Sequence, residues 1–448
     1  MAHEVDMTAG RPFDKLFVFA LPVVAGSILQ QMYNMADAMI AGRFLGSDAL
    51  AAVANCSYVT FLVTILFLGV GNGAGIVISQ FYGAGEIAKV KRAANTMFVF
   101  LFFAAVLCTA VGFTMSGKIL WLLDTPPYLH AASEKYLRIT FSGALFSLGY
   151  TILSTMLNGI GNSKIPLVFL ALSSVVNIIL DIVFITCLAM DVEGLALATV
   201  ISQFTALFAC CVYLNATKQV IQIRISEITF DRRLFMTICR LGIPTGIQNS
   251  LMIVSMMVLQ KEVNHFGVDV IAGRSIAGKL ESVMMLPFTG ISTAIMTYVG
   301  QNIGARKESR LAGGLKCSFV MVLATSSIFF ILYHIFGRLV LSSFTSEPHT
   351  LHEADICLSI IAPSFVFYGM ASAWQSFFRG AGDTIFPLFV TILTQFAYRI
   401  VMIPVFRCID PSPSGIWYLY VSSWILMFLL DFAYYKTNIW RKYYKYIY

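Results

Sequence analysis

Long apolar runs fill most of the chain, and short polar or Gly- and Pro-rich breaks separate them. Each run reaches or exceeds the length of about 20 residues that an α-helix needs to cross the hydrocarbon core of a membrane. The pattern therefore predicts an all-α integral membrane protein with twelve membrane-spanning helices. Their expected bounds are 16–44, 56–81, 93–121, 133–160, 164–189, 193–216, 234–263, 272–302, 311–342, 353–379, 384–406 and 415–437.

The composition excludes an ordinary soluble protein. Hydrophobic residues make up 58% of the 448 residues, and charged residues only 12%, which is about half the share in a typical globular chain. A single soluble core does not hide so much apolar surface, and the mean hydropathy of +0.79 agrees. The net charge of +7 then bears on membrane orientation and on anionic lipids rather than on nucleic acid.

The two halves of the chain repeat each other. The motif Gln-Phe-Tyr-Gly-Ala at 80–84 recurs as Gln-Asn-Ile-Gly-Ala at 301–305, and Pro387 follows Pro166 at the same separation, which we call the repeat interval. Each half holds six predicted spans, so both halves start on the same side of the membrane. The repeat predicts two parallel six-helix lobes with pseudo-two-fold symmetry about the membrane normal, an architecture typical of transporters.

The longest polar break predicts the domain boundaries and the orientation. We expect an N-terminal six-helix lobe at 1–216, a cytoplasmic linker at 217–233, and a C-terminal lobe with a cytoplasmic tail at 234–448. With the N-terminus in the cytoplasm, 20 of the 30 Lys and Arg residues fall in inside segments and 10 in outside segments. This bias predicts that both termini are cytoplasmic in a multi-pass protein of the plasma membrane.

Motifs for nucleotide or metal binding are weak. Two near-misses to a phosphate-binding loop end in Lys118-Ile119 and Lys279-Leu280, without the hydroxyl residue that would hold magnesium. We therefore expect transport to draw on an ion gradient rather than on ATP. His349 and His352 have neighbouring acids, but a solvated helix start explains them better than a metal site. No cofactor is expected.

Carboxylates inside predicted spans point to function, because a charge at the membrane centre costs about 2.5–3.5 kcal/mol. Asp37 lies in the first span and Asp181 in the fifth, with Asn177 one turn before it on the same helix face. At about 1.5 Å per residue, both acids lie roughly 5–12 Å below the outer surface, together with Thr199 and Tyr136. This common level predicts a cation or proton site in the N-terminal lobe. The alternative is a hydrogen-bonded polar plug between helices.

The second half does not repeat these acids. The position equivalent to Asp37 lies near Leu259, and the one equivalent to Asp181 is Met402. Ion coupling is therefore assigned to the N-terminal lobe. A possible polar group of the C-terminal lobe, whose members are predicted to pair with one another or to face a cavity, comprises Lys279, Glu281 and Arg399.

Four motifs together resemble one known family over essentially the whole chain. They are the run Gln-Gln-Met-Tyr-Asn at 30–34 that leads to Asp37, the two Gln-x-x-Gly-Ala repeats, the run 177–181, and Arg-Gly-Ala-Gly-Asp-Thr at 379–384 with Pro387 after it. On these residues the chain resembles the bacterial type of multidrug and toxic compound extrusion (MATE) transporters.

The resemblance implies an ion site and a bend in the first helix, and it shows that one acid of some family members is missing here. Cation-coupled efflux would run through an outward-opening cleft between two six-helix lobes. Pro22 matches the proline at which the first helix bends in family members, and its partner in the second half is Pro244. The chain has no acid at the position that some relatives use in the seventh span, because Glu262 lies too near the outer end. The ion site, where sodium would bind, falls on Asp37, Asn177, Asp181 and Thr199, with Tyr136 nearby.

The favoured function is a cation-coupled antiporter, driven by sodium or protons, that exports amphipathic and often cationic organic compounds by alternating access. The alternative is a flippase for a lipid-linked or polyanionic substrate, which would be expected to line its cavity with many basic residues. A membrane enzyme is not indicated, because the sequence shows no nucleophile–base pair or metal cluster at matching depth. The expected partners of the monomer are small organic substrates and membrane lipids.

Overall fold

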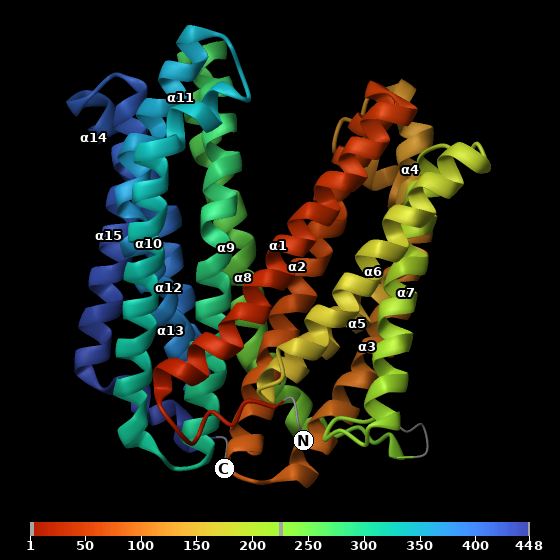
Figure 1. Ribbon diagram of the computed structural model, residues 1–448, viewed down its shortest axis with the longest axis vertical. Coiled ribbons are helices and arrows are strands. Elements are labelled where there is room, and N and C mark those ends of the chain that lie inside the picture. The colour runs from red at the N-terminus through yellow and green to blue at the C-terminus, as the bar shows by residue number, and fades with distance from the viewer. Residues whose placement is uncertain (1–3, 224–226, 447–448) are drawn as a thin grey trace. The chain divides into compact units, whose positions relative to one another are not determined.

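The computed structural model describes residues 4–223 and 227–446, so Arg224 of the predicted linker and Tyr448 of the predicted tail lie outside the described residues. Within these ranges every regular element is helical (Figure 1). The α-helices are α1 Pro12–Ile40, α2 Ser47–Gly83, α3 Ile87–Leu122, α4 Pro127–Ser142, α5 Ala144–Gly159, α6 Lys164–Ile182, α7 Val192–Ala216, α8 Arg232–Val263, α9 Val268–Gly304, α10 Leu311–Ser342, α11 Pro348–Ile361, α12 Phe365–Gly380, α13 Ile385–Thr391, α14 Tyr398–Ile409 and α15 Pro413–Thr437.

The helices match the expected membrane spans. Among the described residues, 11 helices are long and apolar enough to cross a membrane, and α4 with α5 forms a twelfth span that bends by 53°. The prediction of twelve spans is thereby confirmed. The bend falls at Gly143, where a Cβ atom would overlap the side chain of Val200 on α7. The chain is a multi-pass membrane protein.

The repeat predicted from sequence motifs extends to the backbone. Helices α2 and α9 are both 37 residues long, and the repeat interval relates their first residues and also their last. Gly46 (φ +91°) precedes α2 and Gly267 (φ +95°) precedes α9. Only glycine adopts such positive φ values without strain, which explains why both turns carry it. The repeat is confirmed.

The interrupted and terminal spans follow the same interval. Helix α4 begins at Pro127 and α11 at Pro348, and the break after α4 corresponds to the break after α11 at Ser364. Helices α7 and α15 are both 25 residues long, and the repeat interval again separates their starts and their ends. These helices of the two halves therefore start, break or end at matching positions.

The chain folds as two compact units. One comprises Ala25–Gly246 with the N-terminal residues up to Val5, and the other comprises Asp6–Val24 with Ile247–Tyr448. Helices α1 and α8 each give one part to each unit. The division falls two residues after the proline inside each of these helices, Pro22 in α1 and Pro244 in α8.

The alternating glycines of α2 allow close helix packing in the first unit. A Cβ atom on Gly69 or Gly73 would overlap the backbone of α8 around Gly242. On the opposite side of α2, Gly71 and Gly75 lie against Thr155 of α5. Small residues that let backbones approach are the usual basis of helix association in membranes. The glycines therefore hold α2 between α5 and the first part of α8.

The Gln-x-x-Gly-Ala motif at the end of α9 fixes the start of the chain in the second unit. The backbone N–H of Met7 donates to Gln301 Oε1 (3.2 Å), and Asn302 Nδ2 donates to the carbonyl of Met7 (3.0 Å). Asn302 also accepts from Nε of Arg310 (3.0 Å). The motif thus serves a structural purpose that its spacing alone does not reveal.

Candidate functional site

Two carboxyl groups meet in the first unit. Asp37 on α1 and Asp181 on α6 interact directly, and Asp181 is fully buried. Within the described ranges, neither oxygen of Asp181 has a hydrogen-bond donor, and Oδ1 of Asp37 has none either. The two carboxylates repel each other when both are ionised, and Asp181 has lost the water that would solvate it. A proton or a cation between them removes both costs.

Polar groups from neighbouring helices surround this pair. Asn177 lies one turn before Asp181 on α6 and is fully buried. Tyr136 on α4 is 6% exposed and lies close enough to both acids to interact with them. The hydroxyl of Tyr33 on α1 donates to Thr199 Oγ1 on α7 over 3.4 Å. Four helices of one unit therefore supply the predicted residues.

The arrangement offers oxygen ligands. Carboxylates, an amide and hydroxyls are the hard donors that cations such as sodium prefer to nitrogen or sulfur. Tyr33 belongs to the group but was missed by the sequence analysis. Its position one turn before Asp37, on the same helix face, was the available signal. No group of three or more His, Cys, Asp or Glu that could hold a metal ion occurs among the described residues.

Both acid-bearing helices continue into a π-helical segment. Ala41–Leu45 follows α1 shortly after Asp37, and Val183–Cys187 follows α6, which ends one residue after Asp181. In the second unit a third such segment, Ile392–Ala397, ends just before Arg399. A π-segment widens the helix by one residue per turn and is frequent at functional sites. Here the three segments adjoin the intramembrane charges.

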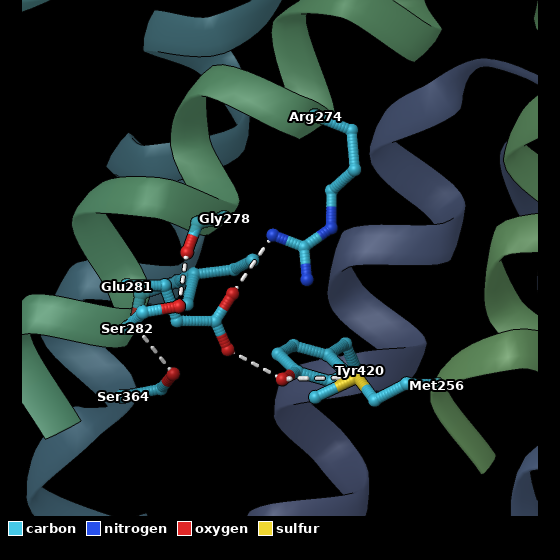
Figure 2. A network of polar contacts seen from close by, with 8 residues as sticks. Met256, Arg274, Gly278, Glu281, Ser282, Ser364 and Tyr420 are labelled. Atoms are coloured by element: carbon cyan, nitrogen blue, oxygen red, sulfur yellow. Dashed lines mark hydrogen bonds and ion pairs between the residues drawn. The ribbon is translucent and has the colours of Figure 1, made fainter. Parts of the chain in front are cut away.

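The second unit contains a different polar network, centred on Glu281 of α9 (Figure 2). Glu281 Oε2 accepts from Arg274 Nη1 over 2.8 Å, and Glu281 Oε1 accepts from the hydroxyl of Tyr420 on α15 over 2.5 Å. The side chains of Arg274 and Glu281 are only 15% and 5% exposed. The carboxylate therefore has a charged and a neutral donor, one on each oxygen.

Arg399 on α14 adjoins this network through Tyr420. Its guanidinium lies 4.5 Å from the centre of the Tyr420 ring, and its Nε and Nη1 donate to Ser423 (3.0 Å) and Ser255 (2.9 Å). Arg399 is 2% exposed, and its Nη2 has no acceptor in the described part of the chain. Lys279 lies apart, exposed and 5.5 Å from the ring centre of Phe344.

The structure thus brings two of the three predicted C-terminal residues together and adds others. Glu281 pairs with Arg274, which the sequence analysis passed over although it lies two helical turns earlier on the same face. Asp431 was also missed. It is fully buried on α15, inside a predicted span, and it lies near Gln375 and Arg379. The general rule for acids within spans was enough to find it.

Comparison with known proteins also divides the chain into two similar halves. The MatE family profile matches twice, at residues 22–183 and 244–405. A probable multidrug resistance protein of Bacillus subtilis, YoeA, is 29% identical over 95% of this chain and 93% of its own length. A probable multidrug resistance protein of Thermotoga maritima, NorM, is 25% identical over 96% and 93%.

Solved structures show the same fold. A transporter of the MOP superfamily from Pyrococcus furiosus matches with a TM-score of 0.88 at 20% identity, over 97% of this chain and 98% of that one. The family profile covers well over half of the chain, in two copies whose start points are Pro22 and Pro244. The chain therefore belongs to the MATE family, whose members are membrane transporters and not enzymes.

Proposed function

We propose that this protein is a cation-coupled antiporter of the plasma membrane that exports amphipathic, often cationic organic compounds by alternating access. One observation carries the coupling: Asp37 and Asp181 are held together inside the first unit with too few hydrogen-bond donors for two ionised carboxylates. The names of the curated relatives, which describe multidrug resistance, support the export of small organic compounds. The protein acts as a monomer surrounded by lipid.

The coupling step is charge neutralisation at the pair of acids. A ligand shifts a conformational equilibrium only by its different affinities for the two states. A cation or proton bound between Asp37 and Asp181 favours a state in which α1 and α6 close around it. Pro22 lacks the N–H of a regular helix, so α1 bends there at low cost. The bend changes the interior of the first unit and releases the organic substrate, which gives exchange.

Sodium and protons compete for the same group in this proposal. The oxygen atoms of Asn177, Thr199 and the two acids suit sodium, and we favour it for that reason. Protons use the same two carboxylates. For a substrate without net charge, either ion is an adequate source of energy, because one monovalent cation entering down 100 mV supplies about 2.3 kcal/mol. That free energy sustains a roughly fifty-fold gradient of such a substrate. Exchange for a singly charged cationic substrate moves no net charge and draws on the concentration gradient of the ion.

The flippase alternative is the weaker one. A polyanionic headgroup needs several basic side chains in one cavity. The described part of the second unit buries Arg274 and Arg399 together, but Glu281 already neutralises one of them. The acids of the first unit would repel such a headgroup. Export of compounds that are not polyanions is therefore favoured.

The test is transport in ATP-free proteoliposomes under an imposed sodium gradient or pH gradient, read with a fluorescent cationic dye such as ethidium. We expect Asp181→Asn to abolish gradient-driven transport while the protein stays folded in the membrane. The matched control is Asp48→Asn, the same change at an exposed position in the first turn of α2. Transport by Asp181→Asn at the wild-type rate would remove the acid pair from the mechanism. The gradient that drives the wild type identifies the ion.

A further inference from the structure

A cavity of about 190 Å³ adjoins the Glu281 network in the second unit. It lies between the last turns of α8, the first turns of α9 and the first turns of α15. We call it the Arg274 cavity, after the charged residue that lines it. Its wall also includes the aromatic rings of Trp417 and Tyr420. The proposed coupling site of the first unit does not include any of these residues.

The Arg274 cavity offers hydrogen-bond donors. Arg274 uses Nη1 for Glu281, and its guanidinium carries further N–H groups. Trp417 is only 3% exposed, and its indole N–H has no acceptor within the described ranges. A buried donor without an acceptor costs about 1–3 kcal/mol. None of the described lining residues bears a carboxylate. An acceptor inside the cavity would meet the guanidinium of Arg274, which lines it.

The charge around the cavity is positive. Arg274 and Arg399 carry two positive charges and Glu281 one negative charge, so the network holds one excess cation. Arg399 is buried at 2% exposure, and the ring of Tyr420 compensates only part of its charge. Removing a charge from water without a counter-charge is costly. An anion in the Arg274 cavity would add a negative charge beside Tyr420, whose ring contacts both guanidinium groups.

The repeat places different polar groups at corresponding positions of the two units. At the repeat interval, Tyr420 takes the position of Thr199, and Arg399 directly follows Tyr398, which takes the position of Asn177. The span that carries Asn177 and Asp181 in the first unit therefore carries Arg399 in the second. A second cation site at this place would need the opposite charges.

The size and the walls of the cavity define the ligand. Whole drug-sized molecules occupy pockets of about 300–1,000 Å³, so 190 Å³ accommodates only one end of such a molecule. A guanidinium presents parallel N–H groups that match a planar carboxylate. Arg274 also lies 5.8 Å from the ring centre of Trp417 and 5.6 Å from that of Tyr420, which leaves flat apolar surface beside the charge.

We propose that the Arg274 cavity is a subsite for the carboxylate of an aromatic compound. It would extend the substrates from cationic compounds to zwitterionic ones that carry an aryl carboxylate. The inference rests on the proposed export function in one respect: it takes the bound carboxylate to be part of an exported substrate. Binding itself is measurable on purified protein without a gradient.

The test is titration calorimetry of the purified full-length protein with 2-naphthoate and with its uncharged analogue 2-naphthamide. We expect naphthoate to bind at least about tenfold more tightly, because a hydrogen-bonded charge is lost in the amide. The double variant R274Q/E281Q, which removes both charges of the ion pair, should weaken naphthoate binding by about tenfold or more. W417F replaces the indole of the wall by a smaller phenyl ring, so a loss of about threefold is expected. The matched control is W121F, at a residue that is 76% exposed on α3.

Several outcomes would overturn the inference. Equal affinity for naphthoate and naphthamide, or unchanged binding by R274Q/E281Q, would show that the cavity does not select a carboxylate. Displacement of naphthoate by chloride, or by phosphatidylglycerol, at comparable concentration would show a site for simple anions or lipid headgroups. D181N should bind naphthoate like the wild type. Loss of export in D181N therefore tests the proposed function. Loss of naphthoate binding in R274Q/E281Q tests the carboxylate subsite, and the two results are independent.

Discussion

At the scale of single residues, the membrane makes buried charge informative, because every such group must be satisfied inside the protein. Asp37 and Asp181 were predictable, since an acid within a span is rare and its depth follows from residue counts. Tyr420, which takes the position of Thr199 in the second unit, was not predictable as a partner of Glu281. Its contact with Glu281 depends on how α15 is rotated against α9, which a single sequence does not specify.

Two residues grouped by the sequence analysis should behave differently when replaced. Glu281→Leu leaves the Arg274 guanidinium without its carboxylate and Tyr420 without its acceptor. Breaking a buried ion pair in this way costs about 3–5 kcal/mol, so thermal unfolding in detergent should shift well below that of the wild type. Lys279→Gln changes an exposed side chain, and its effect should stay within about 0.5 kcal/mol. Equal unfolding temperatures for both variants would contradict the network as described.

At the scale of helices, the apolar pattern predicted the elements well, because span length is a physical requirement of the membrane. The expected fourth span, 133–160, is one run of sequence but two helices, α4 and α5, with a 53° bend between them. Gly143 lies at this bend, and Val200 of α7 occupies the space that a side chain there would need. Hydropathy cannot show such a contact.

Glycine substitutions test the packing of α2. A Cβ atom on Gly73 would approach the backbone nitrogen of Gly242 to 2.7 Å, and backbone atoms cannot move aside cheaply. We expect Gly73→Ala to lower the stability of the protein by more than about 2 kcal/mol, measured by thermal unfolding in detergent. Gly26→Ala is the control, since its Cβ meets Leu170 at an ordinary 3.7 Å. That change should stabilise α1, because alanine is the better helix former by about 1 kcal/mol. Loss of stability in both variants would argue against specific packing.

The proline inside α1 is the second element to test. Pro22→Ala restores a backbone donor and should stiffen the helix, so export should slow while equilibrium cation binding stays nearly unchanged. Pro348→Ala serves as the control, because Pro348 occupies the first turn of α11, where proline costs the helix nothing. Both variants are measured by dye transport in proteoliposomes and by sodium or proton binding in detergent. Normal export by Pro22→Ala would mean that the bend of α1 is incidental to the cycle.

At the scale of the whole molecule, the repeat organises the chain more strictly than its motifs suggest. Helices α2, α4 and α7 start one repeat interval before α9, α11 and α15, yet the two halves bury different polar groups. Duplication therefore preserved the backbone, which packing constrains at many residues. The polar groups depend on a few side chains, and they diverged. This explains why the fold was predictable in detail and the second polar network was not.

The orientation in the membrane is the prediction that belongs to the whole molecule. The excess of Lys and Arg in one set of loops places the linker 217–233 in the cytoplasm and the loop before α11 outside. In a background without reactive cysteines, Glu347→Cys should react with a membrane-impermeant maleimide in intact cells. Lys218→Cys should react only after the cells are permeabilised. Both side chains are exposed, so accessibility within the protein does not distinguish them and only the membrane does. Efficient labelling of Lys218→Cys in intact cells would reverse the topology. The acids Asp37 and Asp181 would then lie nearer the cytoplasmic surface, and the direction of coupling would have to be derived again.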